Sequence, residues 1–165
     1  MAALLINQLF IGIVSGLILV ILALGLALIF GHLRVVNFAH GAFYMLGAYV
    51  GVVVLNLFGN FWIGLFLVPI VMGIVGVIVE RFLIRLMYTR SEYDPLLLTF
   101  GLTFVIVEII RLIFGPVGVP FDIPPALIGA LAFGQYLFPN YLLFVAGISV
   151  VAIAILYFLL EKTDV

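Results

Sequence analysis

Long apolar runs with few polar interruptions dominate this chain. Residues 1–33, 35–79 and 123–160 contain no Lys, Arg, Asp or Glu. A helix needs about 20 mainly apolar residues to cross the roughly 30 Å of hydrocarbon in a bilayer, so the second run holds two spans, broken near residues 56–60. The pattern predicts five membrane-spanning helices, at residues 9–30, 41–58, 61–87, 95–114 and 141–160.

The segment between the last two predicted helices is rich in proline. Five of the seven prolines lie between residues 115 and 140, and proline interrupts helices because it lacks an N–H and clashes with the preceding turn. We therefore expect a folded external loop, whose apolar middle at residues 126–138 lies along the membrane surface or dips into protein. The expected fold class is all-α, a polytopic transmembrane helix bundle of about five spans with a Pro-rich external loop, forming one domain over residues 1–165.

Composition excludes several classes of protein. Of the 165 residues, 68% are hydrophobic and 8% are charged, whereas soluble domains are about 45–50% apolar and about 25% charged. The formal net charge of -1 lacks the basic surplus that binds nucleic acid. Cysteine is absent, which excludes a disulfide framework, a thiolate metal site and a catalytic thiol.

Basic residues set the expected orientation. Arg81 and Arg85, near the end of the third predicted helix, and Arg90, just after it, mark the following loop, and cytoplasmic loops and span ends are enriched in Lys and Arg. Alternation then places the N-terminus and residues 115–140 outside, and residues 161–162 inside.

Glycines at four-residue spacing mark two helix faces. The pairs Gly12/Gly16 and Gly47/Gly51 each place small residues one turn apart, which lets two helix backbones approach closely. We expect both faces to pack against neighbouring helices. Static packing is the plainer interpretation, and helices that slide across these faces are the alternative.

The connection between the first two predicted helices carries the candidate substrate path. If residues 34–41 are helical, Asn37, His40 and Tyr44 fall at i, i+3 and i+7 and share one face. Polar groups at membrane depth are costly and usually face a bundle interior or a water-filled path. An ordinary connector with a hydrogen-bonded histidine is the alternative. A histidine without a second His, Cys or carboxylate at ligand spacing is a poor metal site, so we expect no bound metal.

Glu108 and Arg111 form the candidate intramembrane ion pair. They lie one helical turn apart in the fourth predicted helix, so each can neutralise the other. A proton or ion carrier requires a carboxylate that titrates, and Glu108 already has a partner. Thr99 and Thr103 of the same helix can line a path, although hydroxyls in such helices usually bond to their own backbone.

A resemblance to a known family lies in residues 25–50. Their sequence, GLALIFGHLRVVNFAHGAFYMLGAYV, resembles the signature of the inner-membrane permease of branched-chain amino acid ABC importers, with RVVNFAHG as its most specific part. Similarity extends to DPLLLTFGL at residues 94–102, the IFGP turn at residues 113–116 and the Pro-rich loop. The resemblance covers essentially the whole chain.

This resemblance implies a membrane-spanning permease subunit that forms part of the translocation path of an ATP-driven importer, in a bacterial or archaeal inner membrane. The implied partners are a second homologous permease subunit, cytoplasmic ATPase subunits and a periplasmic amino-acid-binding protein, and the implied substrates are leucine, isoleucine, valine or related amino acids. The permease itself is not an enzyme and needs no cofactor, because ATP hydrolysis resides on the ATPase. Known members are nearly twice as long, so the resemblance also implies the N-terminal portion of a longer permease that does not transport on its own.

Composition alone also permits a secondary transporter or channel-like helix bundle for a small solute, a scaffold, or an intramembrane enzyme. A secondary transporter needs titratable carboxylates inside its spans, and only Glu108 qualifies. A scaffold does not need a polar stripe of Asn37, His40 and Tyr44. An enzyme needs a nucleophile with a base or a metal motif, and the serines have no such context, so we expect no catalytic residue.

Overall fold

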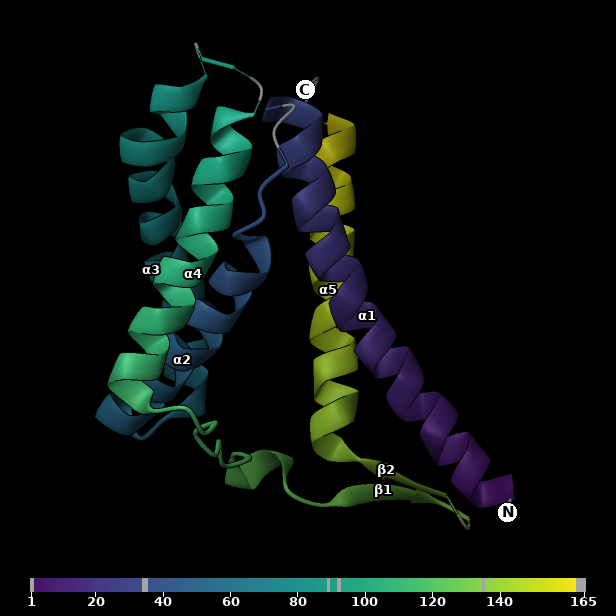
Figure 1. Ribbon diagram of the computed structural model, residues 1–165. Coiled ribbons are helices and arrows are strands. Elements are labelled where there is room, and N and C mark those ends of the chain that lie inside the picture. The colour runs from purple at the N-terminus through teal and green to yellow at the C-terminus, as the bar shows by residue number, and fades with distance from the viewer. Residues whose placement is uncertain (1, 34–35, 89, 92, 135, 163–165) are drawn as a thin grey trace. The chain divides into compact units, whose positions relative to one another are not determined.

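The chain folds into five long helices. The computed structural model describes residues 2–33, 36–88, 90–91, 93–134 and 136–162. Within this part of the chain, all five helices are long and apolar enough to cross a membrane (Figure 1), which confirms the predicted helical bundle. The helices are α1 (Ala2–Leu33), α2 (His40–Phe58), α3 (Phe61–Val79), α4 (Asp94–Phe114) and α5 (Asn140–Lys162).

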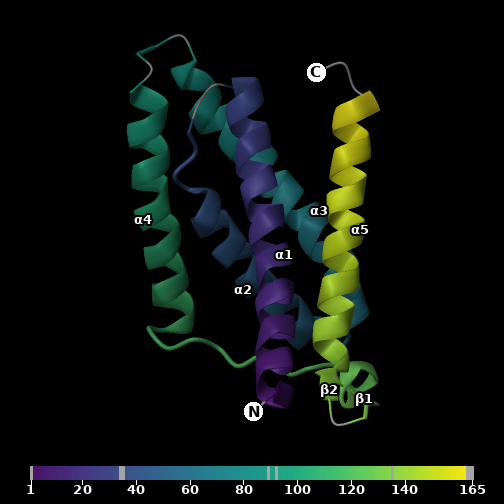
Figure 2. The same ribbon diagram turned by 90° about the vertical axis from the view of Figure 1, so that its right-hand side faces the viewer.

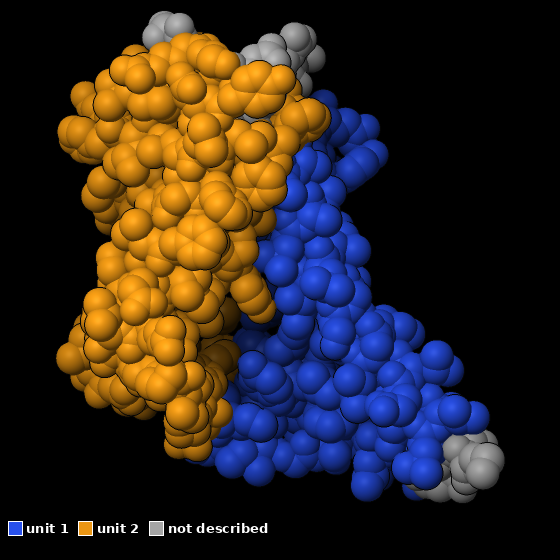
Figure 3. All heavy atoms as spheres, in the orientation of Figure 1, with its two compact units in different colours: residues 1–28, 123–165 blue, residues 29–122 orange. Residues whose placement is uncertain are grey.

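The chain divides into two compact units, shown in different colours in Figure 3. Unit 1 comprises Met1–Leu28 and Ile123–Val165, and unit 2 comprises Ile29–Asp122. Unit 2 therefore holds α2, α3 and α4 together with the connection that precedes α2. Arg34 and Val35, the first two residues of the RVVNFAHG motif, lie outside the described residues.

A tight turn joins α2 to α3 at the predicted break. Gly59 has φ +62°, a left-handed conformation that costs glycine no steric penalty, and its N–H donates to the Leu55 carbonyl. Asn60 then caps the start of α3, because its Oδ1 accepts the Trp62 N–H at 2.9 Å and satisfies one of the free amides at the helix start.

Apolar side chains hold α2 against α4. The buried residues Ala42, Ile106 and Ile110 form one cluster, and the rings of Tyr49 and Phe114 meet at 4.6 Å between centroids. Most other large apolar side chains on these helices point outward. Such a surface is poorly suited to water and well suited to lipid.

The span predicted over residues 61–87 is confirmed as Phe61–Met87, but its hydrogen-bond spacing changes after α3 ends at Val79. The α-helix changes at η1 (Glu80–Ile84), one turn of π-helix, and then at η2 (Arg85–Met87), one turn of 3-10 helix. The Arg85 N–H donates to the Glu80 carbonyl, and the Tyr88 N–H donates to the Arg85 carbonyl. Hydrophobic length predicts a span but carries no signal for this change of hydrogen-bond spacing.

In unit 1 the Pro-rich loop contains a β-hairpin. Strand β1 (Ala130–Phe133) pairs antiparallel with β2 (Tyr136–Pro139), with Ala130 opposite Pro139. The folded loop is as expected, but part of its apolar middle forms strands that pair with each other, which satisfies backbone groups without a helix. Asn140 joins the hairpin base to α5, since its N–H donates to the Gly129 carbonyl at 3.0 Å.

Candidate functional site

The connection before α2 lies beside α4, inward of the start of that helix. Helix α4 has 21 residues, or about 31 Å at 1.5 Å per residue, which matches the hydrocarbon thickness of roughly 30 Å. Thr99 lies one and a half turns into α4 and contacts the Phe38 amide. Figure 1 and Figure 2 show the connection descending beside α4 before α2 begins. Residues 36–39 are therefore non-helical backbone roughly 8 Å inside the end of a membrane-length helix.

Three successive amides of this connection each have a different acceptor. The Ala39 N–H donates to Asn37 Oδ1 at 3.0 Å, the His40 N–H donates to the Asn37 carbonyl at 3.2 Å, and the Phe38 N–H donates to Thr99 Oγ1 at 3.2 Å. Asn37 thus folds back on its own backbone, as asparagine commonly does ahead of a helix. A buried amide without an acceptor costs free energy comparable to a lost hydrogen bond, so these acceptors stabilise the irregular segment.

Thr99 anchors the connection from the side of α4. Its relative exposure is 0%, as is that of Ala39. The Thr99 hydroxyl has two possible acceptors, the Leu96 carbonyl of its own helix at 3.2 Å and the Val36 carbonyl of the connection at 3.5 Å. Beside it, the Phe38 and Phe100 rings make an edge contact at 6.1 Å.

The three predicted path residues do not form one helical stripe. Asn37 precedes α2 and is buried, with 8% exposure. His40 is the first residue of α2 and is half-buried, whereas Tyr44, one turn later, is 54% exposed. The segment is not helical at Asn37 because its side chain and carbonyl take up amides that a helix would pair elsewhere. Only His40 and Tyr44, at i and i+4, share a helical face.

The predicted ion pair is present, with a long separation and exposed side chains. Arg111 Nη1 lies 3.9 Å from Glu108 Oε2, and their side chains are 63% and 57% exposed. Both lie near the end of α4 opposite to Thr99. An exposed pair at this separation is a weak contact, and the Arg111 stem is long enough to reach the lipid headgroups.

The four glycines differ in their surroundings. A Cβ at Gly47 would lie 3.6 Å from Met72 Cγ, and one at Gly51 would lie 3.9 Å from Val68 Cγ2, so this pair faces α3 closely. A Cβ at Gly12 or Gly16 would have no heavy atom within 4 Å. Within unit 1, the small face of α1 thus has no neighbour at these two positions.

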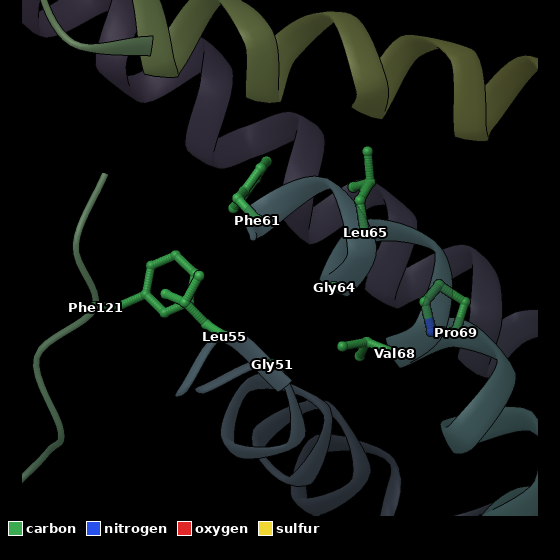
Figure 4. A pocket seen from close by; sticks show the side chains of 8 residues that line it. All are labelled: Gly51, Leu55, Phe61, Gly64, Leu65, Val68, Pro69 and Phe121. Carbon is green, nitrogen blue, oxygen red and sulfur yellow. The ribbon is translucent and has the colours of Figure 1, made fainter. Parts of the chain in front are cut away.

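An apolar cavity of about 260 Å³ lies between α2 and α3 (Figure 4). Gly51 and Gly64 leave the space, and the rings of Phe61 and Phe121 meet at 6.3 Å along its edge. Its remaining lining residues are aliphatic, so no lining side chain can pair with an ammonium or a carboxylate. This cavity suits an apolar group and not a whole zwitterion.

The segment that follows α3, made up of η1, η2 and Tyr88, carries a group with a shifted pKa. The Tyr88 hydroxyl donates to Glu80 Oε1 at 3.3 Å, across the π and 3-10 turns. Partial burial raises the pKa of Tyr88, and the neighbouring Glu80 carboxylate raises it further. The phenol therefore stays protonated, and able to donate, through neutral pH.

Five membrane-length apolar helices define the class of this molecule, a multi-pass helical membrane protein. A family model described as branched-chain amino acid transport system / permease component matches residues 8–165. The chain belongs to this permease family, which confirms the resemblance carried by RVVNFAHG and makes it a transport subunit, not an enzyme. No curated protein and no solved structure matched the chain.

The contact that sequence reasoning missed is the one between Phe38 and Thr99. These residues are 61 positions apart, and neither residue type on its own indicates the other. The only signal was the pair of hydroxyls at Thr99 and Thr103, whose expected bonds to their own helix are present: Thr103 Oγ1 donates to the Thr99 carbonyl at 3.0 Å.

Proposed function

We propose that this permease forms part of the translocation path of an ATP-driven importer of branched-chain amino acids, and that the path runs past residues 36–44. The observation that supports the proposal is the non-helical connection bonded to α4 at Thr99, about one and a half turns inside a helix of membrane-spanning length. Irregular backbone within a membrane occurs only where it is buried in protein or lines a water-filled cavity, and transporters use such breaks in helices as solute sites.

Asn37 has a different role in this region from His40 and Tyr44. Asn37, through its two acceptors, holds the connection in shape. His40 and Tyr44 then present an imidazole and a phenol on one face of α2, where they can exchange hydrogen bonds with water or with the charged ends of a passing amino acid. Their roles in the path are positional and polar, and no step of chemistry is required of them.

The remaining parts of the importer lie on other chains. A second homologous permease subunit completes the path, cytoplasmic ATPase subunits hydrolyse ATP, and a periplasmic amino-acid-binding protein delivers the solute, in the inner membrane of a bacterium or archaeon. Membership of the permease family supports this assembly. The solute-facing surface of this chain requires no cofactor.

Uptake of radiolabelled leucine by the longer permease that contains this chain, assembled with these partners in proteoliposomes, tests the proposal. We expect uptake that requires ATP, and at least a tenfold loss in His40→Ala. Asn56→Ala is the matched control, because Asn56 is an exposed polar residue on the same helix, and it should stay within twofold of the unmodified chain. Full uptake by His40→Ala would contradict a path along this face.

Glu108→Gln distinguishes the alternative of a secondary transporter. An importer driven by ATP should keep uptake within twofold, because Glu108 is an exposed partner of Arg111. Uptake that needs an ion gradient, ignores ATP and is abolished by Glu108→Gln would favour secondary transport.

A further inference from the structure

We propose that Thr99 is a positioning residue of the path, a reversible latch that fixes the connection of residues 36–39 on α4. The transport consequence rests on the proposed function above, whereas the latch itself is a property of unit 2. Thr99 does not touch the solute in this proposal; it acts through Asn37, which lies in the segment it holds, and through His40, which directly follows that segment.

The latch follows from the hydrogen-bonding capacity of one hydroxyl. Thr99 Oγ1 accepts the Phe38 N–H at 3.2 Å, and a hydroxyl has a single proton to donate. That proton has two acceptors, the Leu96 carbonyl within α4 at 3.2 Å and the Val36 carbonyl of the connection at 3.5 Å. When it turns to Leu96, one bond to the connection remains; when it turns to Val36, the connection is held by two.

Burial makes this contact consequential. Thr99 is fully buried, and the connection that it meets contains buried Asn37 and Ala39. The bond itself is part-buried, because Phe38 is 48% exposed, and a fully buried hydroxyl leaves little room for water to replace it. The Phe38 amide therefore depends on the Thr99 hydroxyl, and without it the connection has no polar tie to α4 among the bonds that the structure gives these residues.

Thr103 supplies a matched control on the same helix. Its hydroxyl donates to the Thr99 carbonyl at 3.0 Å, within α4, and makes no such bridge to the connection. Thr103→Val thus removes a partly buried hydroxyl of the same kind without removing the bridge. Thr99→Ser is the conservative variant, since serine keeps the hydroxyl.

Hydrogen–deuterium exchange of peptides spanning residues 36–41 measures the latch directly, in detergent or nanodiscs. We expect the Phe38 amide to exchange at least tenfold faster in Thr99→Val, and within threefold of the unmodified chain in Thr99→Ser and Thr103→Val. Thr99→Ala is measured in parallel, so that the result does not depend on how valine packs, and α5 peptides report whether the rest of the chain is folded. Unchanged exchange in both Thr99→Val and Thr99→Ala, or equal acceleration in Thr103→Val, would overturn the latch.

Leucine uptake in the assembled importer tests the positioning role. At equal membrane levels, the rate of leucine uptake should be at least tenfold lower in Thr99→Val than in the unmodified importer. In Thr99→Ser it should be within twofold of the unmodified importer. Faster exchange with full uptake in Thr99→Val would overturn the role in positioning. An unmodified importer without leucine uptake would overturn the proposed function instead, and the exchange data would still decide whether Thr99 holds the connection.

Discussion

Asn37 and Thr99 stabilise the same four residues by different means. Asn37 bonds locally, to the amides of Ala39 and His40, whereas Thr99 bonds across to Phe38 from another helix. Loss of a local bond loosens the start of α2 itself. Loss of the hydrogen bond between Phe38 and Thr99 leaves α2 intact and removes this tie between the connection and α4.

Asn37→Ala should therefore destabilise the chain by about 1–2 kcal/mol, because the Ala39 amide loses its acceptor in a buried place. Unfolding in detergent, followed through the single tryptophan, measures this cost. Asn56→Ala, at an exposed helical position, should change stability by less than about 0.5 kcal/mol. Equal effects of the two substitutions would contradict the bonding assigned to Asn37.

The Tyr88 phenol, in the segment after η2, titrates at a higher pH than an ordinary tyrosine. It lies just beyond the apolar span Phe61–Met87, and burial together with Glu80 raises its pKa. A phenol whose folded pKa exceeds its unfolded value adds stability that is complete below about pH 10 and is lost as pH rises through the folded value.

The spectrophotometric titration curve of the unmodified chain minus that of Tyr88→Phe isolates this phenol. We expect the difference signal to have a midpoint above about pH 10. Glu80→Gln should lower that midpoint, since it removes the carboxylate that opposes ionisation. A midpoint at or below the ordinary tyrosine value would show that neither burial nor Glu80 acts on it.

At the scale of elements, α2 and α3 meet through glycine. Gly47 faces Met72, whose flexible thioether lies at ordinary contact distance from where a Cβ would stand. Alanine at position 47 should fit and should favour the helix, whereas a leucine would push α3 away.

We expect Gly47→Ala to leave the free energy of unfolding unchanged or slightly raised. Gly47→Leu should lower it by about 1–3 kcal/mol. Gly12→Leu is the matched control, because nothing lies within 4 Å of its added Cβ and the folded chain should accept it. If Gly12→Leu left stability intact but reduced uptake, the open face of α1 would be assigned to a contact with another subunit.

Elements of this molecule differ in how far the sequence determines them. Each helix could be predicted from its apolar length, and the turn at Gly59 and Asn60 from residue types that end and begin helices. The hairpin was missed because Ala130 to Phe133 is as apolar as a membrane-surface segment, and strand pairing is decided by the partner strand. The Phe38 contact with Thr99 joins two elements distant in sequence, so local pattern does not contain it.

At the scale of the whole molecule, orientation in the membrane is the main expectation. Arg81, Arg85 and Arg90 favour a cytoplasmic loop at Ser91, and the Pro-rich segment then lies outside. The chain contains no cysteine, so each introduced thiol reports a single site.

Labelling with a membrane-impermeant maleimide tests this orientation at two exposed positions. In intact cells we expect Gly118→Cys to react and Ser91→Cys to remain protected until the membrane is opened. Inverted vesicles should give the opposite result. Reaction of Ser91→Cys from outside would reverse the assignment of every loop.

The π turn of η1 also bears on which changes of length the chain tolerates. A π turn contains one more residue than the α turn it replaces, so Glu80–Ile84 has a residue to spare. Deleting one residue there should convert the turn to α-helix and leave the faces on either side in phase, whereas the same deletion in the middle of α3 would rotate everything after it by about 100°. Natural insertions and deletions along α3 and η1 should therefore gather at this turn, next to the arginines, and spare the part of α3 that packs on the glycines of α2.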